Sequence, residues 1–257
     1  CMGAAEGLDL LATGGYGRGE QYPHSDVDLL VLGEPAAQAA NEAALGAFFA
    51  ALWDLGLKPG NAVRSLADCA QACREDVSTL TALTEARLLA GSPSVLDALE
   101  DALRGEGLWP AAEYFEAKRD EWRGRHARFN DTANNREPNL KEGPGGLRDL
   151  HVVMWVARAA GLGRSWGEMA RNGLITLDEA RNLRRVERRL KDIRARLHLV
   201  TNRREDRLVF DVQQAVAAQA HIEPTGSRRA GEVLMQRYYL AAKAITQLNT
   251  ILLLNIE

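Results

Sequence analysis

A glycine-rich segment between two apolar runs constrains the fold of this chain more than any other feature. Residues 8–13 lead into Gly14-Gly15-Tyr16-Gly17-Arg18-Gly19-Glu20, and Ser25-Asp26-Val27-Asp28 leads into the apolar residues 29–32. Short apolar runs that are bounded by glycine and polar residues are typical of strands joined by a turn. The sequence therefore predicts one strand at residues 8–13, a turn, and a second strand at residues 26–32.

Asp26 and Asp28 predict a metal site beside this turn. Side chains two positions apart on a strand point to the same face, so the two carboxylates would stand together, which is costly unless a cation bridges them. Gly14 and Gly15 can adopt positive φ and bring backbone N–H groups close to phosphates, and Arg18 could pair with phosphate charge. Most isolated matches of either kind are solvated loops or strand ends, but the two flanking strands favour a nucleoside triphosphate site.

A second glycine-rich segment has the sequence Lys141-Glu142-Gly143-Pro144-Gly145-Gly146-Leu147-Arg148-Asp149. It predicts a tight turn that enters a helix, whose first N–H groups are unpaired and favour anions, with Lys141 and Arg148 at its sides. The alternative is a connection between two helices in which the glycines serve the turn alone.

Both segments resemble one known family. The first turn with Ser-Asp-Val-Asp-Leu-Leu resembles the nucleotidyltransferase domain of the polymerase β superfamily. Residues 137–150 are similar to the Lys-x-x-Pro-Gly-Gly-Leu-Arg-Asp signature of the PII uridylyltransferase/uridylyl-removing enzymes. Supporting matches lie at residues 52–56, 85–91 and 202–208, so the resemblance covers almost the whole chain.

The resemblance implies an enzyme, a nucleotidyltransferase. It would transfer UMP from UTP to a PII nitrogen-signalling protein and release pyrophosphate, with Mg²⁺ as cofactor and Mn²⁺ as a substitute. The candidate catalytic and metal-binding residues are Asp26 and Asp28. The candidate nucleotide-binding residues are Gly14, Gly15, Arg18, Ser25, Lys141 and Arg148.

A third metal-binding carboxylate usually completes the site in this superfamily. The strand predicted at residues 57–63, which Pro59-Gly60 would break, carries no acid. Asp76 and Glu85 lie in the stretch that follows, which we predict to be helical, and we take Glu85 as the candidate third ligand. Two alternatives stay open: an adenylyltransferase of the same superfamily, and a catalytically silent module that binds a nucleotide for regulation.

The order of patterns predicts an α+β fold. Strands and helices alternate to residue 91, and helices follow one another from residue 92, so we expect a small mixed-sheet nucleotidyltransferase domain like that of polymerase β at 1–91 and an all-helical bundle domain for substrate or nucleotide binding at 92–257. Capping boxes begin helices after Ser65 and Thr176. The helices are expected at residues 36–55, 94–103, 110–129, 146–160, 177–200, 209–220 and 226–256.

Composition excludes several classes of protein. A formal net charge of −3 over 257 residues argues against general nucleic-acid binding. No apolar run reaches the length of about 18 residues that a membrane span needs, so we expect a cytoplasmic protein without a membrane partner. Cys69 and Cys73 are expected to be two small helix residues rather than metal ligands. The dense basic run at residues 184–196 is either a solvated helix face or a contact for a nucleotide or an acidic partner.

The resemblance also implies that the full enzyme continues into a metal-dependent phosphohydrolase domain and sensing domains. None of the five histidines of this chain precedes an aspartate. We therefore expect a fragment that has the transferase activity and neither removes UMP nor responds to glutamine.

Overall fold

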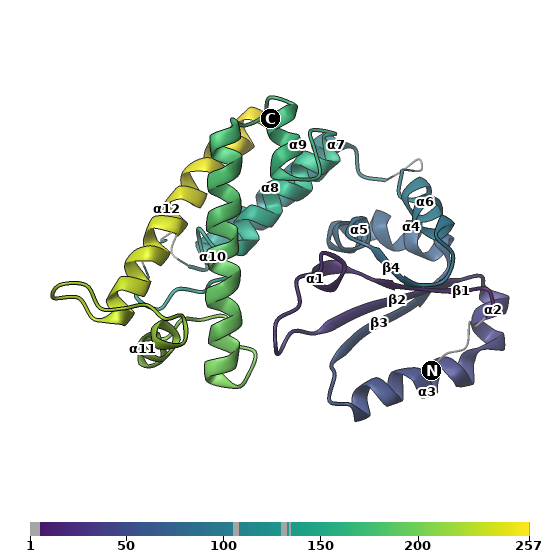
Figure 1. The fold of residues 1–257 in the computed structure, drawn as a ribbon. Helices are drawn as coiled ribbons and strands as arrows, with labels where there is room; N and C mark the ends of the chain where they lie inside the picture. The colour runs from purple at the N-terminus through teal and green to yellow at the C-terminus, as the bar shows by residue number, and fades with distance from the viewer. Residues whose placement is uncertain (1–5, 105–107, 130–132, 134, 257) are drawn as a thin grey trace. The chain divides into compact units, whose positions relative to one another are not determined.

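The computed structural model describes residues 6–104, 108–129, 133 and 135–256 (Figure 1). The chain forms two compact units. The first comprises Cys1–Gln21 and Ser25–Trp109, and the second comprises Tyr22–His24 and Pro110–Glu257. This division falls later than the boundary that we expected at residue 91.

The first unit is built on a mixed four-stranded sheet with the order β3-β2-β1-β4. Its strands are β1 (Leu8–Ala12), β2 (Val27–Gly33), β3 (Pro59–Arg64) and β4 (Arg87–Ala90). The pair β2/β3 is parallel, whereas β1 pairs antiparallel with both β2 and β4. The predicted mixed sheet and its first two strands are thereby confirmed.

Two details of the sheet differ from expectation. Pro59-Gly60 does not break the third strand but begins it. This is allowed because β3 is an edge strand, where a missing N–H costs no ladder hydrogen bond. The strand β4 was not predicted, since its four residues directly follow a helical pattern and lack the alternation that marks a strand.

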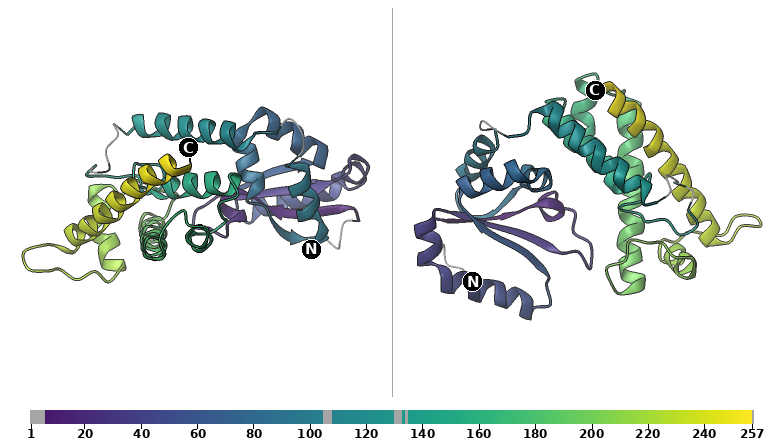
Figure 2. Two further views of the ribbon diagram at one scale, coloured as in Figure 1. Left: turned by 90° about the horizontal axis from the view of Figure 1, so that it is seen from above. Right: turned by 180° about the vertical axis from the view of Figure 1, so that it is seen from behind.

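The helices of the first unit are α1 (Gly14–Gly17), α2 (Pro35–Ala40), α3 (Glu42–Asp54), α4 (Leu66–Glu75), α5 (Val77–Thr84) and α6 (Ser94–Ala102). Figures 1 and 2 show α4 and α5 on one side of the sheet and α2 and α3 on the other. The helix expected at residues 36–55 is interrupted at Asn41, whose Nδ2 donates to Ala37 O (2.8 Å) and so ends α2. The Ser65 capping box is present, with Asp68 N donating to Ser65 Oγ (3.1 Å).

The second unit is entirely helical in the part of the chain that the structure describes. Its helices are α7 (Ala111–Ala127), α8 (Leu147–Ala159), α9 (Trp166–Arg171), α10 (Leu177–Thr201), α11 (Phe210–Gln219) and α12 (Ala230–Ile256). The large buried residues of α8, α10 and α12, including Leu150, Leu190 and Tyr238, form one apolar core. This confirms the helical domain, although α9 was not expected and α12 begins after a turn in which Thr225 pairs with Arg228.

Among the described residues, no helix combines the length and the apolar character that crossing a membrane requires.

Candidate active site

Asp28 occupies a niche that two glycines leave open. It lies on β2 opposite Gly60 of β3 in the parallel ladder. A Cβ atom at Gly60 would lie 2.6 Å from Asp28 Oδ1, and one at Gly14 would lie 3.3 Å from Oδ2. The carboxylate therefore lies between the start of α1 and the edge strand, in space that any other residue at position 60 would fill. Asp26 precedes β2, which begins at Val27, so its placement beside Asp28 stays a prediction.

The predicted glycine turn forms a single helical turn, α1, directly after β1. Gly14 has a positive φ of 52°, as expected, whereas Gly15 does not; the second positive φ in this segment is at Gly19. Thr13 N donates to Asp28 O (3.0 Å), which fixes the end of β1 against the carboxylate-bearing strand. As the first residues of a helical turn, Gly14, Gly15 and Tyr16 have N–H groups without an intrahelical acceptor, which is the arrangement that binds anions.

The segment at the end of α5 and the start of β4 holds this turn in place. A Cβ atom at Gly17 would lie 2.1 Å from Glu85 O, so only glycine fits there. Arg87 Nη2 donates to Tyr16 O (3.0 Å) and its Nε to Gly17 O (3.3 Å). The family match at residues 85–91 thus contains Arg87, which holds the glycine-rich turn in place. Arg87 here and Gly60 beside Asp28 are residues of the candidate site that the sequence analysis did not predict.

Glu85, the candidate third metal ligand, lies beside the glycine-rich turn, and its role as a ligand stays a prediction. Its carboxylate pairs with the guanidinium of Arg18, which also lies 3.2 Å from the Glu20 carboxylate. Among the described residues, no three acidic, histidine or cysteine side chains come together as metal ligands. The structure therefore does not bring Glu85 into a group with Asp26 and Asp28, and it places Arg18 in ion pairs within the turn. Asp76 instead caps α5, accepting from Ser78 N and Thr79 N.

The donor set of the first unit still fits a magnesium ion. Mg²⁺ takes oxygen ligands and is commonly held by one or two carboxylates together with the phosphates of a substrate. Asp28 in its glycine niche, and Asp26 two residues before it in the sequence, would be its protein ligands.

The Gly143–Gly146 turn of the second unit is not the anion site that we expected. Its amides are used internally: Gly146 N donates to Gly143 O (2.8 Å), Leu147 N to Leu140 O (2.9 Å) and Arg148 N to Lys141 O (2.8 Å). Gly145 has a φ of +74°, and a Cβ atom there would lie 2.6 Å from Ala242 O of α12. The glycines therefore serve the turn and its close packing, and Lys141 and Arg148 stay predicted nucleotide contacts through their side chains alone.

A buried ion cluster fixes that turn from within the helical unit. Asp149 is fully buried; it accepts hydrogen bonds from Gly145 N (2.8 Å), His126 Nε2 (2.9 Å) and Arg125 Nη2 (2.5 Å). Burial acts to raise the pKa of Asp149, but the hydrogen bond from His126 and the Arg125 charge outweigh it and hold this pKa below its usual value. The aspartate of the signature is thus a structural anion that ties α7 to the start of α8.

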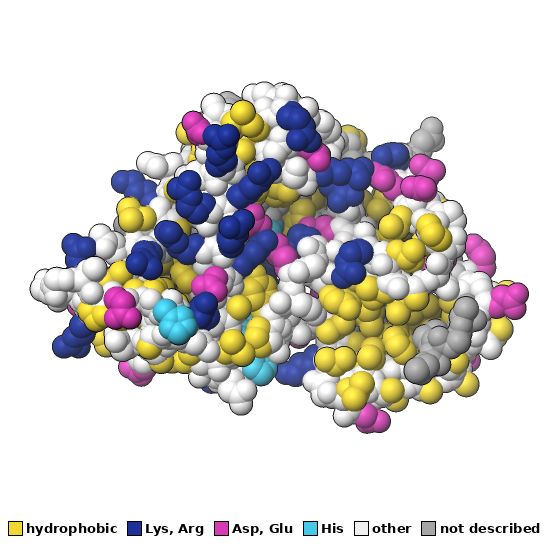
Figure 3. Space-filling model, in the orientation of Figure 1, with side chains coloured by type: hydrophobic (Ala, Val, Ile, Leu, Met, Phe, Trp, Pro, Cys, Tyr) yellow, Lys and Arg dark blue, Asp and Glu magenta, His cyan; other side chains and the backbone are white. Residues whose placement is uncertain are grey.

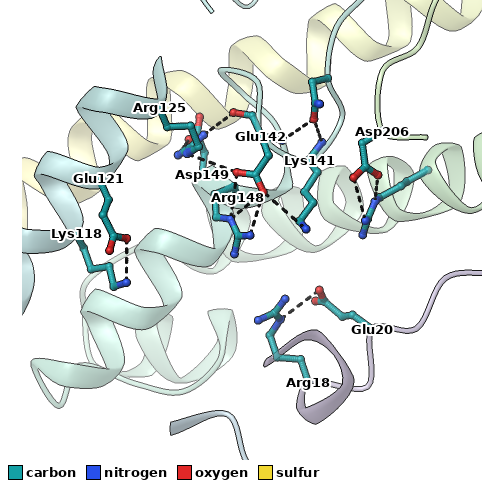
Figure 4. A network of polar contacts seen from close by, with 12 residues as sticks. Arg18, Glu20, Lys118, Glu121, Arg125, Lys141, Glu142, Arg148, Asp149 and Asp206 are labelled. Atoms are coloured by element: carbon teal, nitrogen blue, oxygen red, sulfur yellow. Dashed lines mark hydrogen bonds and ion pairs between the residues drawn. The ribbon is translucent and has the colours of Figure 1, made fainter. Parts of the chain in front are cut away.

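Glu142 interacts with both predicted basic residues, Lys141 and Arg148 (Figure 4). Arg148 Nη2 donates to its Oε1 (2.9 Å), and Lys141 Nζ lies 3.7 Å from the same oxygen. Burial and the nearby Arg148 charge lower the pKa of Lys141. Burial acts to raise the pKa of Glu142, but the hydrogen bond and charge of Arg148 lower it overall.

A second ion cluster in the same unit joins α10 to the loop after it. Arg194 Nε donates to Asp206 Oδ1 (2.5 Å), which also lies 3.3 Å from His198 Nε2. The Arg194 guanidinium lies 4.0 Å from the centre of the Tyr22 ring. Apart from the basic character of α10 and the family match at residues 202–208, which contains Asp206, no sequence signal indicated this cluster.

Comparison with known proteins identifies the family. The model of the GlnD PII-uridylyltransferase family matches residues 113–253, and that of the nucleotidyltransferase domain matches residues 4–78. The chain belongs to the GlnD PII-uridylyltransferase family. The resemblance seen in the sequence is thereby confirmed, as is the nucleotidyltransferase assignment of the first unit.

The curated relatives described here share one name with each other. A bifunctional uridylyltransferase/uridylyl-removing enzyme of Bordetella parapertussis is 55% identical over 251 residues, which are 98% of this chain and 29% of the relative. Enzymes of that name from Burkholderia orbicola and Cupriavidus pinatubonensis are each 51% identical, over 97% and 96% of this chain and 29% and 28% of their own length. The chain thus spans less than a third of the family members that it matches.

Proposed function

We propose that this chain transfers UMP from UTP to a PII-type signalling protein in a magnesium-dependent reaction. The observation that carries the proposal is the Asp28 carboxylate, seated between Gly14 and Gly60 beside a helical turn whose first amides are open to phosphate. In support of the proposal, backbone amides that suit anions and a carboxylate that suits a metal ion lie close to each other, as the attack on a nucleotide phosphate requires.

Each part of the segment has a separate task in this proposal. The amides of Gly14 and Gly15 bind phosphate oxygens, and Ser25 lies in the loop that leads to the acidic pair. Asp26 and Asp28 hold Mg²⁺, which when bound neutralises charge that develops on the phosphates during the displacement. Arg87 keeps the turn in position through the carbonyl oxygens of Tyr16 and Gly17, without contacting the nucleotide.

The proposal is tested by incubating the purified chain with Mg²⁺, labelled UTP or ATP, and a PII-type protein. Mass spectrometry of the acceptor should show addition of UMP. Asp26→Asn and Asp28→Asn should each lower the rate more than about a hundredfold, because losing a metal ligand removes several kcal/mol of transition-state stabilisation. Both variants should keep the thermal unfolding midpoint of the native chain.

The other outcomes separate the alternatives. Addition of AMP in place of UMP would make the chain an adenylyltransferase, and UTP binding without transfer would make it a regulatory module. Asp54→Asn is the matched control, because Asp54 is an exposed acid at the end of α3. Near-native rates in both Asp26→Asn and Asp28→Asn would show that the site lies elsewhere.

A further inference from the structure

The strongest charged feature outside the candidate site is the exposed face of α10. This helix carries eight Lys and Arg residues and four Asp and Glu residues, in a chain whose formal net charge is −3. Figure 3 shows Lys and Arg side chains gathered over the part of the second unit that Figure 1 labels α10. We call Arg181, Arg184, Arg185, Arg188 and Arg189, all exposed, the arginine stripe.

Intramolecular contacts do not account for the arginine stripe. Arg181 pairs with Asp178, but no ion pair among the described residues involves the other four members. In contrast, the basic residues farther along α10 are paired: Lys191 with Glu187, Arg194 with Asp206 and Arg196 with Asp192.

The spacing of the stripe is unfavourable for the helix itself. Arg181 and Arg185, Arg184 and Arg188, and Arg185 and Arg189 are like-charge pairs at i,i+4, which destabilise a helix. Carboxylates of a partner outside the unit would offset this repulsion, whereas solvent and salt alone only screen it.

The chemistry of the stripe indicates what that partner is. Arginine forms planar, bidentate pairs with carboxylates and is enriched at protein interfaces. Leu177 is 61% exposed and precedes Arg181, Arg184 and Arg188 by four, seven and eleven residues, so it lies on the same helix face. An exposed leucine beside the arginine stripe favours a protein surface over a nucleic acid, because protein interfaces combine apolar contacts with charged ones.

We infer that the arginine stripe of α10 is the docking surface for an acidic face of the protein that accepts the nucleotide. This inference rests on the proposed function, because that function supplies a protein acceptor. In this inference the stripe binds the acceptor protein, so it acts on acceptor affinity and not on the chemical step.

The test is a steady-state comparison of the chain with Arg185→Glu/Arg188→Glu. We expect the KM for the PII-type acceptor to rise about tenfold or more, while kcat and the KM for UTP stay within about twofold. Arg185→Lys/Arg188→Lys should keep most of the affinity for the acceptor, because lysine keeps the positive charge. Raising NaCl from about 50 to about 500 mM should lower the acceptor affinity of the native chain toward that of Arg185→Glu/Arg188→Glu.

The matched control is Arg229→Glu/Arg237→Glu, which changes the net charge equally at two exposed arginines just before and on α12. It should leave the acceptor KM unchanged. A neutral form with glutamine at positions 184, 185, 188 and 189 repeats the measurement without new acidic groups.

Binding of the acceptor, measured by calorimetry, decides the inference even if no transfer is seen. If the native chain transfers no UMP, the proposed function fails, yet loss of acceptor binding in Arg185→Glu/Arg188→Glu would still support docking at the stripe. An unchanged acceptor KM and unchanged binding would overturn the inference. The inference would also be overturned if Arg185→Glu/Arg188→Glu lost binding of duplex DNA or RNA but kept binding of the acceptor.

Discussion

At the scale of single residues, Gly60 is the position where the smallest change should affect the site. In Gly60→Ala, the new methyl group would lie 2.6 Å from Asp28 Oδ1, so the carboxylate must move. Because a displaced metal ligand raises the barrier, we expect UMP transfer to fall about tenfold or more, equivalent to about 1.4 kcal/mol. Transfer assays beside urea unfolding of the same preparation would measure both effects.

Gly46→Ala is the control for that substitution. Gly46 lies within α3 with nothing inside 4 Å of its added Cβ, so alanine there should stabilise the chain by about 0.5–1 kcal/mol and leave transfer unchanged. Native activity in Gly60→Ala would mean that Asp28 does not need its observed position.

The residues of the candidate site show what sequence alone reaches. The turn at Gly14 and the strand that carries Asp28 could be predicted, because apolar runs on both sides of a glycine-rich segment are typical of strands joined by a turn, whereas the metal-binding role of Asp28 stays a prediction. Gly60 and Arg87 could not, since their importance depends on the register of β3 against β2 and on the existence of β4. Glu85 was taken as the candidate third ligand because the superfamily usually has one; its side chain pairs with Arg18, and the ligand role stays a prediction.

At the scale of elements, the junction of α7 and α8 depends on the buried Asp149. Its carboxylate is fully buried against Arg125, which is 5% exposed, so Asp149→Asn leaves this buried guanidinium only its longer ion pair, to Glu142 at 4.0 Å. We expect a loss of about 3–5 kcal/mol in the free energy of unfolding at pH 7. Urea unfolding would measure it, with Asp120→Asn on the exposed face of α7 as a control that changes little.

The pH dependence of this loss has a defined sign. The folded-state pKa of Asp149 lies below its usual 3.8, so its stabilisation is fully present above that value and is lost as pH falls through the folded-state pKa. The difference in unfolding free energy between the native chain and Asp149→Asn should therefore shrink once the pH falls below 3.8. A difference that stayed constant down to the lowest accessible pH would contradict this role.

The starts of helices that have capping residues could be predicted from the sequence. The capping residues Ser65 and Thr176 correctly marked the starts of α4 and α10. The start of α8 was located correctly, but its anion site was wrong, because sequence cannot show that the amides at Gly146 and Leu147 already have carbonyl acceptors. The strand β4 escaped prediction because its four residues lack alternation, and α9 was missed because it has only six residues, although Ser165 caps its start by accepting from Glu168 N.

At the scale of the whole molecule, α6 decides where the chain can be divided. Val95 and Leu99 of α6 are buried within the first unit, whereas the apolar core of the second begins at Leu140. We expect a chain of residues 110–257 to unfold cooperatively on heating, and one of residues 92–257 to aggregate more because it exposes α6. Circular dichroism and light scattering would compare them; better behaviour of the longer piece would place the boundary near residue 91.

The edges of the sheet have a consequence for how molecules of this protein meet one another. One edge strand, β3, begins with Pro59, which has no amide hydrogen, and the other, β4, is four residues long with an irregular register against β1. Neither edge presents a long, regular row of free amides and carbonyls to a neighbouring chain. The sheet is therefore poorly suited to recruit strands from other molecules, which protects the concentrated protein from edge-to-edge aggregation.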